Sequence, residues 1–240
     1  MDVTGLVASA GTAAVCTSAG VLAYAVRVPS SSLLAPSVYK GAGARSAIAL
    51  TFDDGPSEST PEVLEILARH GAPATFFQCG ANVRRLPQVS REVAVRGHEI
   101  GNHTDTHPKL YFQSARFIYG ELARAQETIE QTTGLRPRFF RAPYGARWFG
   151  LRQAQQRLGL LGVTWTTLAL DWKWPEPRVI QRLLNGSGNG AIFCLHDGRG
   201  LESRPDIRAT LGALRAVLPE LIQQGFHFEK VTDILCPTRN

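Results

Sequence analysis

The sequence of 240 residues lacks closely spaced cysteines. Its four cysteines stand far apart, and none belongs to a C-x-x-C pair: Cys16, Cys79, Cys194 and Cys236. This spacing excludes a zinc ribbon and a C-x-x-C redox motif, and it indicates no disulfide pairing. We therefore expect buried thiols, above all at Cys194, which lies within the apolar run 191–195.

Lysine is also scarce, because 22 of the 26 basic residues are arginine and the four lysines are scattered. A nucleic-acid-binding surface requires clustered basic residues, so we expect no nucleic-acid partner. The formal net charge of +6 suits an acidic cell-wall polymer better. With 44% hydrophobic and 19% charged residues, the composition excludes a disordered chain, a collagen-like repeat and a polytopic membrane protein.

The first 28 residues differ from the rest of the chain. Val3 to Val26 contains 24 residues without a charge, which is long enough to cross a hydrocarbon core of about 30 Å. Fifteen of these residues are Ala, Gly, Ser or Thr, no basic region precedes them, and Ala23-Tyr24-Ala25 fits a cleavage site. We expect residues 1–28 to be a signal peptide or a membrane anchor; a small-residue helix packed on the protein is the alternative.

The remaining chain divides into three parts. Residues 29–46 contain Pro and Ser and are expected to form a linker. Residues 47–236 are expected to form one catalytic domain, followed by a tail at 237–240. Membrane association through residues 3–26 and an extracytoplasmic location, anchored or secreted, follow from the expected leader or anchor. The sequence does not indicate an oligomeric state.

Short apolar runs alternate with longer amphipathic stretches beyond residue 47, which predicts βα units and a parallel sheet. Strands are predicted at 48–52, 74–79, 99–102, 138–141, 162–167, 191–195 and 226–231. Helices are predicted at 60–70, 87–96, 114–133 and 206–224. An open doubly wound sheet and a barrel of about seven units both fit, and the length favours a short α/β barrel.

Ionisable residues follow the predicted strands: Asp53 and Asp54, His103, Arg141, Asp171 and His196. The carboxyl ends of parallel strands share one rim, where α/β proteins carry their active sites. Convergence on that rim is therefore a functional signal, although each residue alone has a structural alternative, such as an ion pair for Arg141 or a core position for His196.

Two histidines stand four residues apart in His103-Thr104-Asp105-Thr106-His107. This spacing allows both imidazoles to share a metal ion, and a carboxylate from another strand end would complete a His-His-Asp set. Three such ligands leave a coordination position open for water on zinc. The spacing alone is a weak signal, because two histidines four apart are often unrelated.

Asp53 and Asp54 come between a strand and Gly55-Pro56, so the two carboxylates point in different directions. A solvated turn is the alternative, since Asp, Gly and Pro are turn residues. With Asp54 on a metal ion, Asp53 would be a free base suited to taking a proton from metal-bound water.

Five ordered motifs resemble those of the polysaccharide deacetylases with the NodB homology domain, carbohydrate esterase family 4. The similarity covers about residues 47 to 235, and the motifs are 51–56 (TFDDGP), 103–107 (HTDTH), 141–145 (RAPYG), Asp171-Trp172 and Leu195-His196-Asp197. Five motifs in order are far more specific than any one. The chain departs from the family pattern at Ala142, where many members have Pro. We expect this difference to affect the stiffness of the loop more than the chemistry.

This resemblance implies a distorted (β/α) barrel of the NodB type and metal-dependent removal of acetyl groups from N-acetylglucosamine units. The implied metal ligands are Asp54, His103 and His107, with Asp53 as general base and His196 as general acid. Arg141 would hold the base and Asp171 the acid. Trp172 and Leu195 would line the pocket for the acetyl methyl group, and the backbone N–H of Tyr144 would bind the oxyanion.

The expected activity is therefore that of a hydrolase acting on carbon–nitrogen bonds in a polysaccharide such as peptidoglycan or chitin. One divalent metal ion is expected, with Zn2+ favoured and Co2+, Ni2+ or Mn2+ also compatible with His-His-Asp ligands. An O-acetyl esterase of the acetyl-xylan type and a catalytically silent glycan-binding module are the alternatives. The sequence does not indicate which polymer or which acetyl group is attacked.

Overall fold

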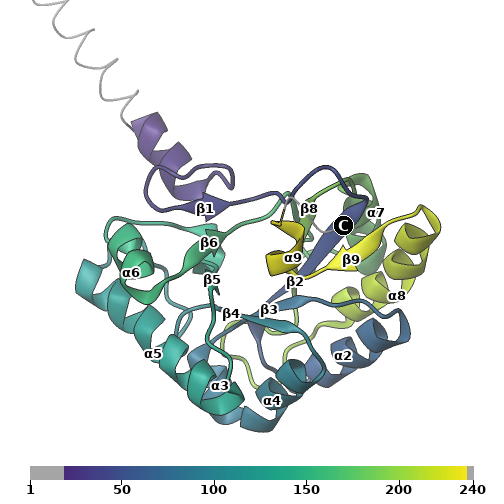
Figure 1. The fold of residues 1–240 in the computed structure, drawn as a ribbon, viewed down its shortest axis with the longest axis horizontal. Helices are drawn as coiled ribbons and strands as arrows, with labels where there is room; N and C mark the ends of the chain where they lie inside the picture. The colour runs from purple at the N-terminus through teal and green to yellow at the C-terminus, as the bar shows by residue number, and fades with distance from the viewer. Residues whose placement is uncertain (1–18, 237–240) are drawn as a thin grey trace, which may run out of the picture.

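A computed structural model of the chain describes residues 19–236, which form a curved sheet surrounded by helices (Figure 1). The strands are β1 (Ser37–Val38), β2 (Ala47–Gly55), β3 (Thr75–Gln78), β4 (Glu99–Asn102), β5 (Phe139–Phe140), β6 (Leu161–Val163), β7 (Thr167–Leu168), β8 (Ala191–His196) and β9 (His227–Glu229). The helices are α2 (Thr60–Arg69), α3 (Gly80–Arg85), α4 (Pro87–Val95), α5 (Ala115–Thr133), α6 (Leu151–Leu158), α7 (Glu176–Asn185), α8 (Arg208–Gln223) and α9 (Val231–Ile234). A 3-10 turn, η1, spans Pro143–Gly145.

All paired strands of the sheet run parallel, in the order β1-β6-β5-β4-β3-β2-β8-β7, with β9 pairing to the start of β2. No strand pairing joins β7 to β1 within residues 19–236, so the sheet remains an open half-barrel in the described chain. Parallel strands end at the same side of a sheet, and their carboxyl ends therefore meet at one rim.

Strand β2 lies at the centre of the sheet, and all nine of its residues are buried. Ile48, Leu50 and Phe52 pack into the core against the helices. The small Ala47 and Ala49 point to the other face of the sheet, where they pack in a separate apolar cluster with residues such as Ile192. A strand that is buried on both faces reads as a continuous apolar run, which is why the sequence predicts this strand well.

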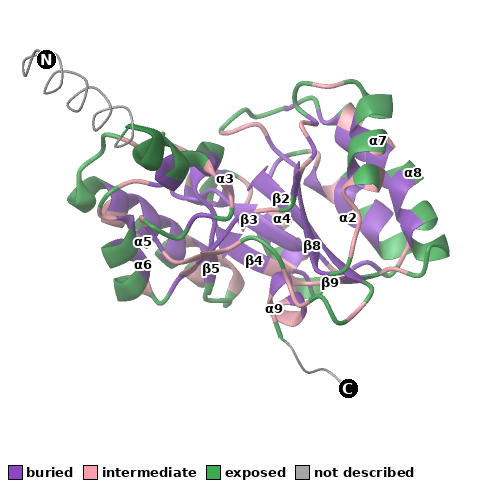
Figure 2. Cartoon of the chain, turned by 90° about the horizontal axis from the view of Figure 1, so that it is seen from above, coloured by how far each residue is buried: buried purple, intermediate pink, exposed green. Residues whose placement is uncertain are grey.

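Helices cover the outer side of the sheet, as Figure 1 shows for α2 to α6 and α8. In Figure 2 the strands are buried and the helices carry their exposed residues on the side away from the sheet. Helix α2 has a proline in its first turn, and Gly71, with φ +57°, follows its C-cap. Pro at the start and Gly past the end are the usual helix boundaries, and both were read from the sequence.

The predicted α/β fold with a distorted parallel barrel is confirmed, although the sheet has nine strands rather than about seven. The predicted strand 162–167 divides into β6 and β7, because the chain changes neighbours between them. The Thr164 N–H donates to the Val38 carbonyl beside β6, whereas the Thr166 N–H donates to the Ile192 carbonyl in β8. Helices α3, α6, α7 and α9 and strand β1 were not predicted, and α9 begins at the last residue of the predicted strand 226–231.

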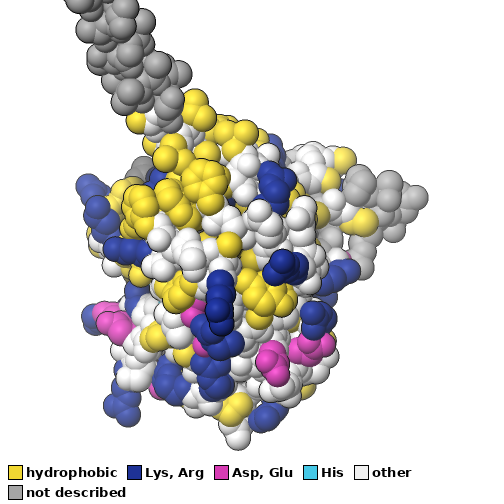
Figure 3. Space-filling view, turned by 90° about the vertical axis from the view of Figure 1, so that its left-hand side faces the viewer, with side chains coloured by type: hydrophobic (Ala, Val, Ile, Leu, Met, Phe, Trp, Pro, Cys, Tyr) yellow, Lys and Arg dark blue, Asp and Glu magenta, His cyan; other side chains and the backbone are white. Residues whose placement is uncertain are grey.

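Residues 25–46 lie against the domain, whereas residues 19–24 are exposed. Residues 19–27 are helical, Ala25 and Val26 are buried, and β1 pairs with β6 within the stretch expected to be a linker. Hydrophobic side chains gather on the molecular face next to this segment (Figure 3). No helix within residues 19–236 is both long enough and apolar enough to span a bilayer. Most of the uncharged stretch 3–26 and the whole of the expected tail 237–240 lie outside the described residues.

The thiols of Cys79 and Cys194 are buried, as expected, whereas Cys236 is exposed. Cys16 lies outside the described residues. Burial raises the pKa of Cys79 and of Cys194 well above the ordinary thiol value, so both remain protonated at neutral pH.

Candidate active site

A cleft of about 480 Å³ opens at the carboxyl ends of the strands. Asp53 and Asp54 reach it from the end of β2, His103 from the residue after β4, and His196 from the end of β8. His107 also lines it. The structure thus brings the ionisable residues of the predicted rim into one site, with Arg141 and Asp171 held directly behind them.

The two carboxylates diverge because the register of β2 against β3 shifts between Asp53 and Gly55. Asp54 takes a φ of +72°, and His107 takes +56°, both in the left-handed region that non-glycine residues seldom occupy. Such backbone conformations cost free energy and persist where the surroundings impose them, frequently at functional sites. Here they turn Asp54 and His107 toward each other.

One carboxylate oxygen and two imidazole nitrogens converge at the floor of the cleft. Asp54 Oδ1 lies 3.2 Å from His103 Nε2 and 3.0 Å from His107 Nε2. The other oxygen, Oδ2, accepts a hydrogen bond from the Gly200 N–H at 2.8 Å. Burial raises the pKa of Asp54, but imidazoles of His103 and His107 that carry a proton on Nε2 would donate to this carboxylate, outweigh burial and hold that pKa well below its ordinary value.

The hydrogen bonds around this cluster fit a bound cation. His103 Nδ1 lies 2.8 Å from the Arg141 carbonyl oxygen, which can only accept, so Nδ1 carries the proton and a neutral ring presents a lone pair at Nε2. Asp54 Oδ1 is buried and has no hydrogen-bond donor. Converging lone pairs repel one another unless a cation lies between them. His-His-Asp is a suitable ligand set for a divalent transition metal.

Asp53 is held on both of its oxygens. Arg141 Nη1 lies 2.7 Å from Oδ1, and Cys194 Sγ lies 3.4 Å from Oδ2. Arg141 is fully buried and also donates to Thr51 Oγ1 and to the carbonyls of Val163 and Thr164. Its guanidinium is therefore fixed in one orientation, and it fixes the carboxylate of Asp53 in turn.

His196 is held by Asp171. Its Nδ1 lies 2.8 Å from Asp171 Oδ1, and the other carboxylate oxygen accepts from the His196 N–H and the Thr210 hydroxyl. Burial lowers the pKa of His196, but Asp171 outweighs burial and raises that pKa to about 9. Burial likewise raises the pKa of Asp171, and His196 brings it below its ordinary value. His196 is thus protonated at neutral pH and keeps Nε2 as its remaining donor.

Aromatic residues border the cleft beside two of its histidines, His107 and His196. The Tyr144 ring lies 4.8 Å from the ring of His107, and the Trp172 ring lies 4.7 Å from that of His196. Tyr144 is 54% and Trp172 44% exposed, so both present open ring surface. Leu195, in contrast, is fully buried in the core behind the cleft, and Leu168 lines the cleft instead.

Comparison with known proteins identifies the family of this chain. The model of the polysaccharide deacetylase family matches residues 40–163, just over half of the chain. The chain belongs to the polysaccharide deacetylase family. It is therefore a hydrolase of the class that acts on carbon–nitrogen bonds, and the family resemblance read from the sequence is confirmed.

Two curated polysaccharide deacetylases illustrate the relationship. The chitooligosaccharide deacetylase of Azorhizobium caulinodans is 39% identical over 191 residues, covering 76% of this chain and 91% of the relative. The peptidoglycan-N-acetylglucosamine deacetylase PgdA of Listeria monocytogenes is 34% identical over 206 residues, covering 85% of this chain but only 42% of the relative. The chain thus spans less than half of the Listeria protein.

A solved structure shows that the deacetylase fold also occurs without activity. The CE4 family pseudoenzyme of Bacillus anthracis superposes with a TM-score of 0.77 at 28% identity, covering 85% of this chain and 70% of that one. Membership of the family therefore does not establish the roles of individual residues, and the geometry of the side chains has to carry that argument.

Several lining residues of the deacetylase cleft were not singled out from the sequence as site residues: Arg27, Trp165, Leu168, Cys194, Arg199 and Gly200. Arg199 and Gly200 follow His196 closely in the same loop, and that proximity was a usable signal. Arg27 belongs to a segment distant in sequence, and its residue type alone carries no such signal.

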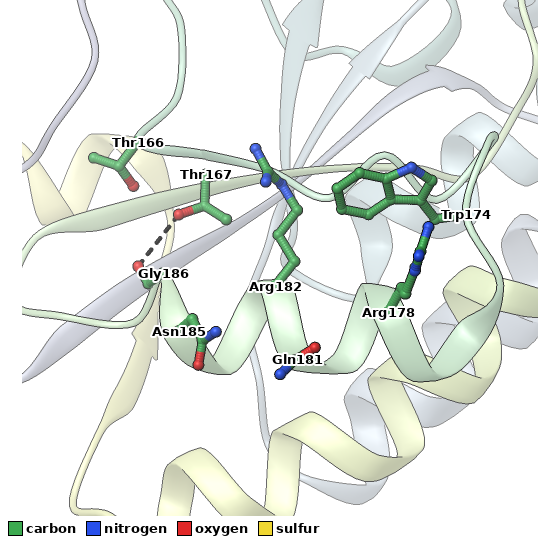
Figure 4. Close-up of a pocket in the computed structure, with 8 residues that line it drawn as sticks. All are labelled: Thr166, Thr167, Trp174, Arg178, Gln181, Arg182, Asn185 and Gly186. Carbon is green, nitrogen blue, oxygen red and sulfur yellow. Dashed lines mark hydrogen bonds between the residues drawn. The ribbon is translucent and has the colours of Figure 1, made fainter.

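A second hollow, of about 430 Å³, lies between β7 and α7 (Figure 4). Trp174 lies within reach of two guanidinium groups there, 5.9 Å from Arg178 and 5.3 Å from Arg182. Figure 4 shows both arginines rising from α7 beside the indole ring. Arg182 also donates to the Leu168 carbonyl. Trp174 also packs against the hydrophobic core, so these contacts give it a structural role in the deacetylase fold.

Proposed function

We propose that the chain is a metal-dependent N-deacetylase that hydrolyses the acetamide of N-acetylglucosamine units in a polysaccharide, peptidoglycan or chitin. The observation that carries the proposal is the placement of two independently held proton-transfer groups in one cleft. Arg141 holds Asp53, Asp171 holds His196, and a His-His-Asp cluster lies in the same cleft.

Asp54, His103 and His107 would hold the metal, for which we propose Zn2+. When bound, the ion would polarise the acetamide carbonyl and lower the pKa of water. Asp54 contributes a negative charge, and the Arg141 carbonyl fixes the tautomer of His103 so that Nε2 faces the cluster.

Asp53 serves as the general base in this proposal. Its carboxylate accepts a proton from the water that attacks the acetamide carbonyl. Arg141 donates to Oδ1 of this carboxylate at 2.7 Å and so keeps it in place at the cleft. The backbone N–H of Tyr144 is proposed to stabilise the oxyanion that develops on the carbonyl oxygen.

His196 serves as the general acid. The carbon–nitrogen bond breaks when the amine leaves, and the amine must receive a proton to do so. His196 is protonated at neutral pH because of Asp171, and it donates this proton to the nitrogen. The products are acetate and a free amine on the sugar, and Trp172 borders the cleft beside the donor.

Localisation and partners are proposed on the same basis. The uncharged stretch 3–26 supports an anchored or secreted, extracytoplasmic protein, where a cell-wall glycan is accessible. Membrane association through this stretch is part of the proposal.

Acetate release by the full chain tests the proposed function. Metal-loaded protein is incubated with N-acetylglucosamine hexamer and, separately, with acetyl-xylan, in the presence and absence of a chelator. We expect chelator-sensitive release from the hexamer and little from acetyl-xylan. Release from acetyl-xylan alone would support the O-acetyl esterase instead, and binding of the hexamer without release would support the silent module that the Bacillus anthracis relative exemplifies.

A further inference from the structure

The N-terminal segment of the described chain contributes to the candidate active site. Arg27 is the last residue of the helical stretch 19–27, its side chain is exposed, and it lines the same cleft as Asp53 and His196. It belongs to none of the five motifs and has no part in the proposed chemistry. Its place in the cleft therefore needs a separate explanation.

A buried arginine from the catalytic domain fixes this segment. Arg147 is only 3% exposed, and its Nη1 donates to the Ser31 carbonyl at 2.7 Å while its Nη2 donates to the Val28 carbonyl. Its own N–H donates to the Val26 carbonyl at 3.2 Å. A buried guanidinium is costly unless it is hydrogen-bonded, and here the Val28 and Ser31 carbonyls, which follow Arg27, accept from it, while the backbone N–H of Arg147 binds the residue before Arg27. The domain itself thus positions Arg27.

A second guanidinium, that of Arg199, lines the same cleft. It donates to the backbone carbonyls of Gly198, Asp171 and Asp206 at 3.0 to 3.2 Å. Within residues 19–236, neither Arg27 nor Arg199 forms an ion pair with a carboxylate. Carbonyl bonds orient a guanidinium without neutralising its charge. The carboxylates of Asp171 and Asp206 also act on Arg199, but each is already paired, with His196 and with Arg208, so the charge of Arg199 remains available at the cleft.

The negative charges of the cleft are already engaged. Asp53 pairs with Arg141, and Asp54 would be neutralised by the cation proposed between it and the two histidines. The unpaired charges at the cleft are therefore positive.

We propose that Arg27 is a specificity-determining residue that, together with Arg199, binds a carboxylate carried by the substrate glycan. A guanidinium is the side chain best matched to a carboxylate, because its planar donors can bind both oxygens. The inference rests on the proposed function and sharpens it. The preferred substrate is a glycan with an acidic substituent on a sugar near the acetamido group that is cleaved.

The experiment compares two forms of one oligosaccharide. The probe is an oligomer of alternating N-acetylglucosamine and N-acetylmuramic acid, and its control is the same oligomer after conversion of every carboxylate to a methylamide. Both kcat/KM for acetate release and Kd, from tryptophan fluorescence, are measured on the metal-loaded full chain. The variants are Arg27→Gln and, as a matched exposed arginine on α8 away from the cleft, Arg215→Gln.

We expect the wild-type chain and Arg215→Gln to prefer the charged oligomer about tenfold, a preference that higher salt weakens. Arg27→Gln is expected to lose most of this preference in both readouts. Equal use of the two oligomers by the wild type, or an unchanged preference in Arg27→Gln, would overturn the inference. Binding preference that depends on Arg27 without acetate release from any oligomer would overturn the proposed function and leave the inference standing.

Discussion

Arg141 donates to the carboxylate of Asp53 at 2.7 Å, and both groups are buried. The same residue accepts, through its carbonyl, the bond that orients His103. One residue at the end of β5 therefore fixes a proposed base and a proposed metal ligand. Disturbing its side chain while leaving its backbone in place separates these two effects.

Replacing Arg141 with Met should destabilise the fold, because it leaves the Asp53 carboxylate buried without its partner. Loss of one partner from a buried ion pair costs about 3–5 kcal/mol in the free energy of unfolding. Urea unfolding followed by circular dichroism measures this. Arg208→Met is the control, since its pair with Asp206 is exposed, and it should leave the midpoint unchanged. An equal effect of both variants would contradict the structural account of Arg141.

Metal binding should depend on His107. We expect His107→Ala to weaken Zn2+ binding by more than about 100-fold, beyond the effect typical of residues that only orient ligands. Isothermal titration and metal analysis of the dialysed protein measure affinity and stoichiometry without reference to activity. His70→Ala, at the C-cap of α2, is the control and should retain one ion per chain. Tight binding by His107→Ala would show that the cluster is not the metal site.

The upper pH limit of activity should follow His196. Its pKa of about 9 lies above the ordinary value, so the proton donor is present at neutral pH and is lost as the pH rises through 9. Asp171→Asn removes the carboxylate that raises this pKa, and the upper limb of the kcat/KM profile should move to lower pH. Asp206→Asn, an exposed carboxylate, should leave the profile in place. An unmoved limb in Asp171→Asn would contradict the role of His196 as acid.

The ion pair between His196 and Asp171 should also make the stability of the fold depend on pH. Because the folded-state pKa of His196 is raised, its pairing with Asp171 contributes fully below the unfolded-state pKa of about 6.5. That contribution is lost as the pH rises through about 9. Unfolding of the wild type should therefore show a loss of stability between these values that is smaller in Asp171→Asn.

The cysteines should differ sharply in reactivity. Cys79 and Cys194 are buried, with pKa values raised by burial, whereas Cys236 is exposed. Treatment of the native protein with iodoacetamide at pH 8, followed by peptide mass spectrometry, should modify Cys236 and spare the other two. Urea should expose Cys79 and Cys194 to the reagent as well. Rapid native labelling of Cys194 would contradict its position beneath Asp53.

Much of the site follows from the sequence, because motif residues stand at strand ends and parallel strands end at one rim. Asp54, His103 and His107 meet as this rule predicts. Leu195 shows where the rule fails. In the run 191–195 every residue is apolar, so no alternation indicates which side chains face the inside of the curve. Cys194 faces Asp53, and Leu195 packs in the core behind it.

The unpredicted features depend on contacts between distant parts of the chain. Arg147 and Ser31 are 116 residues apart in sequence, and only the folded chain shows that one binds the other. Strand β1 is two residues long and depends on β6 for its pairing. Helix α7 is different, because Val179, Ile180, Leu183 and Leu184 follow a helical spacing, so the sequence did carry a usable signal for this helix.

The central claim is that Asp53 and His196 perform proton transfer at one metal-dependent site. The most direct test is the rate of acetate release from N-acetylglucosamine hexamer by metal-loaded wild type and Asp53→Asn, after circular dichroism and metal analysis show that both are folded and loaded. The account predicts that Asp53→Asn lowers kcat about 10²- to 10⁴-fold. An unchanged rate in a folded, metal-loaded Asp53→Asn chain would contradict it.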